Sequence, residues 1–373
     1  MARVVKINRG AKRKKPKKKK VRKVSLWGIL HYVTVLVSAL ALLISYFSIF
    51  FDPTRFWPPM FFGLYFIPIF LLNLVLLVIG LARHSRATFV TFVILLPSLL
   101  VADKFVKIGS EDTALSGEKI KVLTYNVGRY HAGRGKMSYD EAADGIRRFI
   151  RSENADIVCL QEFMSADTAD LFKLLPEYPY HADYYFKGSR YFGNVTLSRY
   201  PILDTEVIKF KNSTNLALFS DVKIGSRMVR IFNCHLESYS ISFTSLIKRI
   251  SKKGAFQEEF NSVHLKVKEA NIRRAQQVRE VLDKEASSNW PTIVCGDFND
   301  TPISYAYHQL MSRKKDSFAE AGTGFSATYS TLWPLLRIDY ILIPSEYSAR
   351  KHTIYRIPFS DHYPVTTDIL FEQ

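Results

Sequence analysis

Long uncharged runs near the N-terminus and short apolar runs farther along divide this chain into two kinds of sequence. Leu26 to Phe51 contains no charged residue. As a helix this run would be about 39 Å long, more than the roughly 30 Å hydrocarbon core of a bilayer. Met60 to Ala82 is a second uncharged run of spanning length. The two runs predict a helical hairpin in a membrane.

A third apolar run, Ala87 to Ala102, decides the topology. It would be about 24 Å long as a helix, and it contains Pro97. The loop before it carries Arg83 and Arg86, so the positive-inside rule places that loop in the cytoplasm. Three crossings then put the rest of the chain outside, whereas a re-entrant or interfacial third run keeps it in the cytoplasm. We expect three spans, a multi-pass protein and an extracytoplasmic domain.

Charge is concentrated in the first residues. The chain has a formal net charge of +18, and 1–23 holds thirteen of the 52 lysines and arginines and no acid, which leaves 39 bases against 34 acids in the remainder. A basic tail directly before an apolar run is typical of a cytoplasmic flank held near anionic lipid. Nucleic-acid binding by this tail is the alternative.

Beyond the apolar runs, short β-rich segments alternate with amphipathic segments, which predicts an α/β domain of layered sheets with helices outside. We divide the chain into a basic tail (1–23), a transmembrane region of two or three helices (24–106), a linker (107–118) and one soluble domain (119–373). The expected strands are Ile120–Tyr125, Ile157–Leu160, Gly193–Leu197, Met228–Cys234, Thr292–Cys295 and Tyr340–Ile343, and the expected helices are Tyr139–Ser152 and Val267–Glu285.

Polar side chains follow several of these strands where strands meet loops. Asn126 ends the first strand and Glu162 ends the second, each offering a hard oxygen donor from a buried strand. Mg²⁺ is usually bound through one or two carboxylates plus substrate phosphate, so a sparse set of ligands is expected. Three further clusters occur within one stretch: Gly296-Asp297-Phe298-Asn299-Asp300, Ile338-Asp339-Tyr340 and Ser360-Asp361-His362. The pattern predicts a metal-dependent site that cleaves phosphate esters.

Seven short motifs in order resemble the endonuclease/exonuclease/phosphatase superfamily. They are Asn126, Gln161-Glu162, Gly193-Asn194 with Leu197-Ser198-Arg199-Tyr200-Pro201, His235-Leu236, Gly296-Asp297-Phe298-Asn299, Ile338-Asp339-Tyr340 and Ser360-Asp361-His362. The resemblance covers about Lys119 to Phe371. It implies a four-layer α/β sandwich of the deoxyribonuclease type, here preceded by the transmembrane helices.

The resemblance also implies a metal site with Mg²⁺ as the cofactor and Mn²⁺ as the alternative. Glu162 would be the principal carboxylate ligand. Asn126 would be a further ligand or a phosphate contact, and Asp361 would support a metal position.

The catalytic functions are implied in the same way. Asp297 and Asn299 would orient the attacking water and the phosphate. His362 would be a base or a phosphate-stabilising group, with Asp339 accepting a hydrogen bond from its imidazole. His235 would reach the phosphoryl oxygens or protonate the leaving group. Arg190, Asn194 and Tyr329 are expected around the substrate.

The core motifs do not separate phosphodiesterases from phosphatases. Arg337-Ile338-Asp339-Tyr340 departs from the Trp-Cys-Asp-Arg signature of inositol 5-phosphatases. A near-neutral domain argues against a nuclease, which usually leaves a basic footprint. We expect the partners to be the bilayer and a phosphorylated substrate, a phospholipid or an envelope metabolite, with nucleic acid less favoured and no protein partner predicted. A nuclease and a catalytically inactive membrane scaffold are the alternatives.

Overall fold

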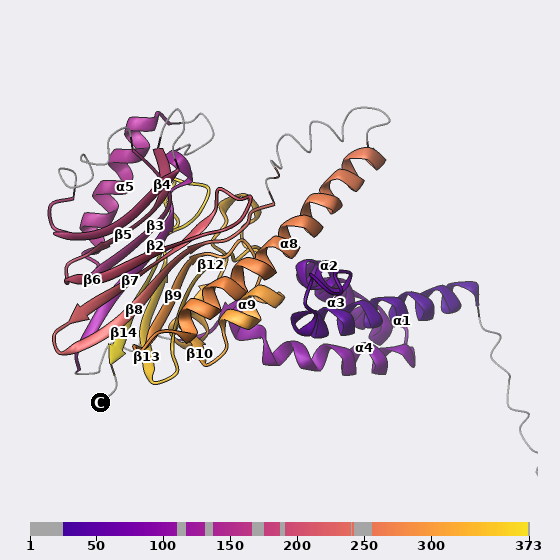
Figure 1. Ribbon diagram of the computed structural model, residues 1–373. Helices are drawn as coiled ribbons and strands as arrows, with labels where there is room; N and C mark the ends of the chain where they lie inside the picture. Colours follow the sequence, from indigo (N-terminus) through magenta and orange to yellow (C-terminus); the bar gives the residue numbers. More distant parts are fainter. Residues whose placement is uncertain are drawn as a thin grey trace, which may run out of the picture.

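Two six-stranded sheets form the body of the molecule (Figure 1). The structure, a computed structural model, describes residues 25–109, 117–130, 137–165, 175–186, 191–239, 241 and 256–371; the basic tail and Arg190 lie outside them. The strands are β1 (Val106–Lys107), β2 (Lys119–Asn126), β3 (Ile157–Ser165), β4 (Tyr180–Phe186), β5 (Tyr191–Ser198), β6 (Ile202–Lys209), β7 (Leu216–Ile224), β8 (Arg227–His235), β9 (Thr292–Asp297), β10 (Lys314–Asp316), β11 (Gly324–Phe325), β12 (Asp339–Pro344), β13 (Tyr347–Ile354) and β14 (Val365–Phe371).

Helices flank the sheets and precede them. The α-helices are α1 (Leu26–Phe47), α2 (Pro59–Leu64), α3 (Phe66–Ala82), α4 (Ala87–Leu95), α5 (Tyr139–Glu153), α8 (Phe256–Ala286), α9 (Tyr305–Leu310) and α10 (Ser317–Ala321), and the short 3₁₀ segments are η1 (Ser48–Phe50), η2 (Leu96–Leu100), η3 (Ala102–Lys104), η4 (Gly128–Tyr130) and η6 (Ser330–Leu332).

Each sheet has a parallel pair near its centre. One sheet runs in the order β10-β12-β9-β8-β7-β6 and the other in the order β13-β14-β2-β3-β5-β4. The pairs β8/β9 and β2/β3 are parallel, whereas the other pairings within these two sheets are antiparallel. The carboxyl ends of β2, β3, β8 and β9 therefore meet at one end of the sandwich, where ligand sites commonly form.

The molecule has four layers: a helix, two sheets and a helical layer. The inner sheet faces pack on each other through small branched side chains such as Val122 and Ile231. α5 covers the outer face of one sheet, and α8 and α9 cover the outer face of the other (Figure 1). This arrangement confirms the predicted α/β sandwich.

α5 illustrates how the sequence fixes an outer layer. Ser138 accepts a hydrogen bond from the Glu141 backbone N–H, and the Glu141 carboxylate accepts one from Ser138, which forms a capping box. Ala142, Ile146 and Ile150 recur at a spacing of four and are buried against the sheet.

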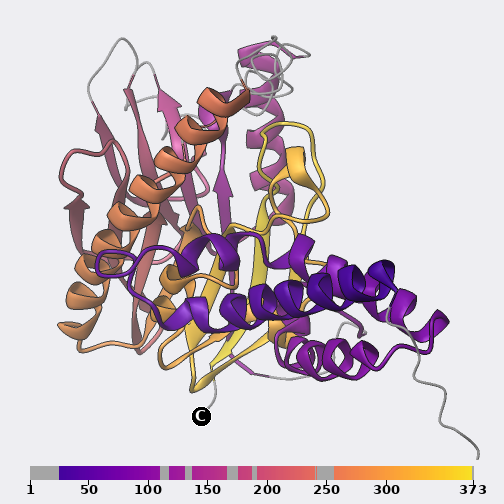
Figure 2. The ribbon, with the colours of Figure 1, turned by 90° about the vertical axis from the view of Figure 1, so that its right-hand side faces the viewer.

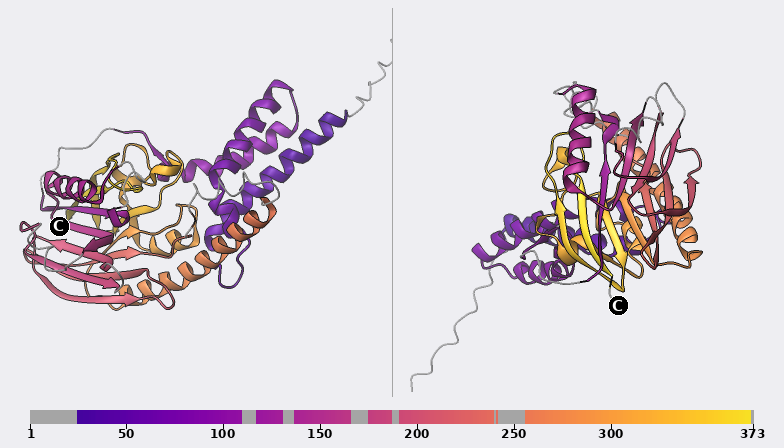
Figure 3. Two further views of the ribbon diagram at one scale, coloured as in Figure 1. Left: turned by 90° about the horizontal axis from the view of Figure 1, so that it is seen from above. Right: turned by 90° about the vertical axis from the view of Figure 1, so that its left-hand side faces the viewer.

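The N-terminal helices form a separate bundle that extends away from the sandwich (Figure 2, and Figure 3, left). α1, α3 and α4 pack on one another. The buried Asn73 amide on α3 donates to the Ser38 carbonyl and hydroxyl oxygens on α1 at 3.1 and 2.8 Å. Tyr46 on α1 donates to the Ile94 carbonyl oxygen on α4 at 3.0 Å. Specific polar contacts therefore hold the bundle together in addition to apolar packing.

The prediction of one continuous helix over 60–82 is wrong. The run breaks at Tyr65, between α2 and α3. Pro68 explains the break, because its ring lacks an N–H and clashes with the carbonyl of Leu64, four residues earlier. Among the described residues, one helical run, Leu26–Phe50, is both long and apolar enough to cross a membrane.

Other predicted bounds need correction. The six expected strands exist and the sheets contain more, including β6, β7, β13 and β14. α8 begins at Phe256 rather than at Val267, and α4 changes to the 3₁₀ segment η2 at Leu96, next to Pro97. The loss of a hydrogen bond at proline accounts for this last change.

Candidate functional site

Strand register brings the polar side chains of one sheet into a row. His235 at the end of β8 lies opposite Asp297 at the end of β9. Asp339 at the start of β12 lies opposite Asp297 on the other side. Each of three adjacent strands, β8, β9 and β12, thus contributes one residue. Three residues far apart in sequence become immediate neighbours.

Gly296 makes this row possible. Its φ is +128°, and a Cβ atom there would lie 2.0 Å from the Cys234 carbonyl oxygen on β8. A larger residue would force β9 away from β8. The glycine before Asp297 is therefore needed for the close approach of the two strands.

Asp297 lies at the centre of the site and is 1% exposed. One carboxylate oxygen accepts from the Asn299 backbone N–H at 2.8 Å, and the other accepts from the Asn126 and Asn299 amides at 2.9 and 3.1 Å. Burial raises the pKa of Asp297 to about 7, although His362 opposes the shift. The site thus holds a carboxylate oriented by three hydrogen bonds.

His362 and Asp339 form a second part of the site. His362 Nδ1 lies 3.0 and 3.2 Å from the two Asp339 carboxylate oxygens, and Nε2 lies 3.8 Å from Asp297. Burial lowers the pKa of His362, but Asp339 and Asp297 outweigh it and raise this pKa well above its usual value. Asp339 therefore fixes the ring and favours an imidazolium.

His235 has the opposite electrostatic character. Its Nε2 lies 3.6 Å from Glu162 and 3.9 Å from Asp297, and it has no hydrogen-bond partner among the described residues. Burial lowers the pKa of His235, which favours the neutral ring. A buried ring nitrogen with unmet hydrogen-bonding capacity points to a substrate contact.

Glu162 forms one wall of a cleft. β3 contains a register shift between Leu160 and Phe163, and Glu162 has a φ of +50° there, which turns its backbone out of the regular ladder. Its carboxylate lies 3.1 Å from the Arg129 guanidinium. The cleft has a volume of about 460 Å³ and is lined by Arg129, Glu162, Asn212, Ser213, Thr214, Asn215, His235, Glu237 and Ser238.

Asn126 and Asp361 meet around Gly128. The Gly128 backbone N–H donates to the Asn126 side-chain oxygen at 3.0 Å. A Cβ atom on Gly128 would lie 3.0 Å from an Asp361 carboxylate oxygen. A side chain at Gly128 would crowd this Asp361 oxygen and the Ser360 hydroxyl, which would lie 3.1 Å from the added Cβ atom.

The predicted substrate residues have different placements. Tyr329 packs edge-on against the His362 ring, with 5.3 Å between ring centroids. Asn194 is buried between the sheets, where its amide donates to the Asn233 carbonyl at 3.2 Å, and it does not line the cleft. Arg190 lies outside the described residues. Of the two residues that the structure describes, Tyr329 lies beside the catalytic row.

Sequence reasoning missed several cleft residues. Arg129 follows Asn126 closely in sequence and could have been found from that proximity. Ser213 and Asn215 come from the connection between β6 and β7, two strands that were not predicted, and the Ser213 hydroxyl donates to Glu237 at 2.6 Å. Their contribution depends on strand pairing, which no local motif reveals.

Two sequence profiles match the chain. The Endonuclease/Exonuclease/phosphatase family matches residues 123–362. A domain of unknown function, DUF8431, matches residues 28–105, the helical region.

The individual proteins that resemble this chain share only a low sequence identity with it. "Uncharacterized protein YbhP" of Escherichia coli (strain K12) is 26% identical over 275 residues, covering 67% of this chain and 95% of that protein. The fold is similar to an endonuclease/exonuclease/phosphatase from Bacteroides vulgatus, with a TM-score of 0.53 and 19% identity over 68% of this chain and 100% of that one. D. rerio TDP2 complexed with a single-strand DNA product gives a TM-score of 0.50 and 19% identity, covering 68% and 99%.

Proposed function

This chain belongs to the endonuclease/exonuclease/phosphatase family, and from that premise we propose that it is a membrane-anchored, Mg²⁺-dependent phosphoesterase acting on a phospholipid or an envelope-associated metabolite. One observation carries the proposal: Asp297 lies between the His362–Asp339 pair and His235, and His235 lines a polar cleft. Hydrolysis of a phosphate ester needs an oriented water, charge neutralisation and stabilisation of the leaving oxygen.

The donor set fits a hard divalent ion. Glu162 offers a carboxylate to the cleft, and Asn126 and Asp361 offer oxygens beside Gly128. Carboxylate and amide oxygens are the ligands that Mg²⁺ prefers. We assign Glu162 as the principal ligand, with Asn126 and Asp361 in support. A bound ion would neutralise charge on the phosphate as a Lewis acid.

Asp297, Asp339 and His362 form a second candidate for metal binding, since each offers an atom within 4.8 Å of the others. We assign this group to catalysis instead. Both oxygens of Asp339 face the His362 ring, and Asp297 already accepts three hydrogen bonds. Three hydrogen bonds leave Asp297 about one of its four lone-pair sites, and we assign that site to the attacking water instead of a metal.

The three central residues have separate functions in this mechanism. Asp297 orients the attacking water, and its three donors hold the carboxylate in position. The raised pKa of His362 keeps it cationic, so it stabilises charge on the phosphoryl oxygens instead of acting as a base. The neutral His235 ring hydrogen-bonds a phosphoryl oxygen through its unpartnered Nε2.

Exposed apolar surface supports the membrane anchor. Only 33% of the most apolar window of the Leu26–Phe50 run is buried, although a core helix of a soluble protein would be mostly buried. α3 and α4 also expose large apolar side chains, including Val78 at 66% and Phe89 at 72%. The Asn73–Ser38 contact makes α1 an integral part of the bundle, which argues against a cleaved signal sequence.

We propose that α1, α3 and the α4–η2 segment all cross the membrane, with the N-terminal tail cytoplasmic and the sandwich outside. α3 has 17 residues, about 25 Å at the helical rise, so it would need local bilayer thinning.

A second candidate function is a nuclease. It is favoured by the similarity of the fold to D. rerio TDP2, which is complexed with a single-strand DNA product. An inactive scaffold is disfavoured because all the core polar residues are present.

The test is turnover by the purified full chain in detergent. Phospholipids, soluble phosphate mono- and diesters and single-stranded DNA would be supplied with Mg²⁺, with Mn²⁺ and with a chelator. We expect lipid hydrolysis that chelation abolishes and Mg²⁺ restores. Cleavage of DNA alone would identify a nuclease, and no turnover of any ester would refute the enzyme.

A further inference from the structure

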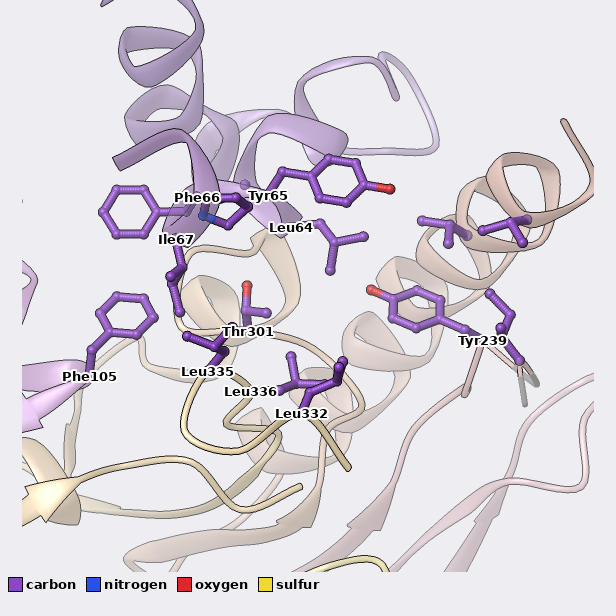
Figure 4. A pocket seen from close by; sticks show the side chains of 15 residues that line it. Leu64, Tyr65, Phe66, Ile67, Phe105, Tyr239, Thr301, Leu332, Leu335 and Leu336 are labelled. Carbon is purple, nitrogen blue, oxygen red and sulfur yellow. The ribbon is translucent and has the colours of Figure 1, made fainter. Parts of the chain in front are cut away.

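An apolar pocket lies where the helical bundle meets the sandwich (Figure 4). Leu64, Tyr65 and Phe66, at the break between α2 and α3, form one wall. Val263 and Val267 on α8 form the opposite wall. Its volume of about 260 Å³ is just below the usual range of about 300–1,000 Å³ for ligand sites. The pocket is therefore suited to a slender apolar group.

Three segments of the chain connect residues of the catalytic site directly to residues that line the pocket. Tyr239 follows His235 by four residues, and Thr301 follows Asn299 by two. Leu332 follows Tyr329, the neighbour of His362, by three. Two residues span at most about 7 Å of chain, so Thr301 lies close to the catalytic row. The pocket is a neighbour of the cleft at the same end of the sandwich.

Thr301 supplies a polar group at the edge of the pocket nearest the site. Its side chain is 8% exposed, and its hydroxyl oxygen has no hydrogen-bond partner among the described residues. Figure 4 shows this hydroxyl directed toward the space between the apolar walls. A buried hydroxyl with unmet capacity favours a ligand that carries an acceptor at this point.

The opposite side of the pocket leads to the surface of the helical bundle. Leu71 and Leu72 follow Pro68 by three and four residues, so they lie on the same face of α3. They are 48% and 46% exposed, and Pro68 lines the pocket. An apolar surface therefore runs from the pocket along α3.

Aromatic and basic side chains lie beside the pocket, and the His264 ring lies 6.5 Å from the ring of Tyr65, which lines it. Lys268 on α8 lies over the Trp57 ring, 4.6 Å from its centroid. The His264 ring packs against Phe61 at 5.1 Å. Tryptophan and basic side chains are typical of the lipid headgroup level of a membrane. The entrance on this side is thus suited to lipid.

We propose that the pocket binds one acyl chain of the phospholipid substrate, with the ester carbonyl oxygen accepting from Thr301 and the phosphate in the catalytic cleft. The order of chemical groups in a phospholipid matches the order along the protein: phosphate, ester carbonyl, hydrocarbon. This assignment rests on the proposed lipid phosphoesterase. It adds a determinant of specificity outside the polar site, and it predicts selection for long-chain lipids over soluble esters.

Two matched variants of α8 test the pocket. Val263→Trp fills it from a half-buried position, whereas Leu265→Trp places the same ring on a side chain that is 55% exposed and does not line the pocket. Thr301→Val keeps the side-chain shape and removes the hydroxyl. Circular dichroism and thermal unfolding of each variant would establish that it folds.

The probe is a phosphatidic acid with a photoactivatable diazirine at mid-chain, added to vesicles of phosphatidylethanolamine and phosphatidylglycerol containing the full-length protein. Cross-linked peptides are identified by mass spectrometry. We expect cross-links to Tyr65 or Tyr239, reduced at least about fivefold by Val263→Trp because a packed pocket cannot admit the chain. Thr301→Val should reduce them about two- to tenfold, the effect of one lost hydrogen bond. Leu265→Trp should leave them unchanged.

Cross-links confined to the exposed faces of α1 and α3, or equal yields in Val263→Trp and Leu265→Trp, would overturn the assignment. Metal-dependent hydrolysis of the soluble ester bis(p-nitrophenyl) phosphate, measured on the same samples, reports the catalytic site separately. Turnover of that ester without pocket cross-links would reject the acyl-chain site alone. If the unaltered protein hydrolyses neither the lipid nor the soluble ester, the proposed enzymatic function is rejected.

Discussion

The same sheet carries two buried groups that each combine an acid with basic side chains. One is the pair of Asp316 and Arg337, the other is the catalytic row around Asp297, and their hydrogen bonding differs. Asp316 and Arg337 form a bidentate pair with N–O distances of 2.7 and 2.6 Å, and the Tyr307 hydroxyl also donates to Asp316. In the catalytic row, Asp297 lies 3.8 and 3.9 Å from the nearest nitrogens of His362 and His235. Both carboxylates are 1–2% exposed.

This difference separates a buried acid that stabilises the fold, Asp316, from one that is placed for catalysis, Asp297. The Asp316 carboxylate accepts four hydrogen bonds, two on each oxygen, which fill its lone-pair sites, whereas Asp297 accepts three. The two histidines around Asp297 sit beyond direct hydrogen-bond distance, and His235 keeps an unpartnered nitrogen among the described residues. Burial alone therefore does not identify an active site, because the saturated Asp316 carboxylate and Asp297 are equally buried.

The largest expected effect follows from Asp297→Asn. Asparagine keeps the shape but removes the charge that orients the water, so kcat should fall by about 10³ to 10⁴, near the upper end for acid–base groups. The free energy of unfolding should change by less than about 2 kcal/mol. Turnover and thermal unfolding measured together check this. A variant that retains more than a tenth of the activity would contradict the assignment.

Asp316→Asn should have the opposite profile. It leaves the Arg337 charge buried without its partner, which should lower the free energy of unfolding by about 3–5 kcal/mol. The kcat of the folded fraction should stay within about twofold of the unaltered protein. Denaturant unfolding provides the measurement. The double variant Asp316→Asn/Arg337→Met is the control, because removal of both charges should restore most of the stability.

A smaller effect on catalysis is expected for Asp339→Asn. An asparagine can still accept from His362 Nδ1 but no longer raises the pKa of that ring, so the imidazolium is less populated. We expect a fall in kcat of about 10² with KM little changed. Steady-state kinetics on a soluble phosphodiester give both values. A change in KM alone would assign Asp339 to substrate binding.

The smallest effect concerns acid stability. Burial raises the pKa of Asp316, but Arg337 outweighs it, and the net pKa is lowered. A lowered folded pKa contributes stability that is present above the unfolded value of about 4 and is lost as the pH falls toward the folded value. Unfolding measured from pH 6 to pH 3 should show this loss. It should be absent in the double variant at 316 and 337.

Much of the fold could be predicted because each catalytic motif directly follows a strand or precedes one. Asp297 ends an apolar run and Glu162 follows another, so their placement required only local patterns. β6 could not be predicted in this way, because its middle residues are exposed and it lies at a sheet edge. Such a strand has no alternating apolar face to read.

Non-local pairing explains the remaining errors. The cleft position of Ser213 depends on β6 and β7, and Asn194 was expected at the substrate because no motif indicates that its amide spans the two sheets. The helix break at Tyr65 has a local cause in Pro68, but the uncharged run around it matches a continuous spanning helix in length and hydropathy.

The most direct test of the account is ³¹P NMR of phospholipid vesicles incubated with the full-length protein and Mg²⁺, beside the Asp297→Asn variant. This measurement detects hydrolysis of monoesters and diesters alike. The account predicts a new phosphorus resonance that grows with the unaltered protein and is absent with the variant and with a chelator. Unchanged lipid spectra, or the same conversion with Asp297→Asn, would contradict it.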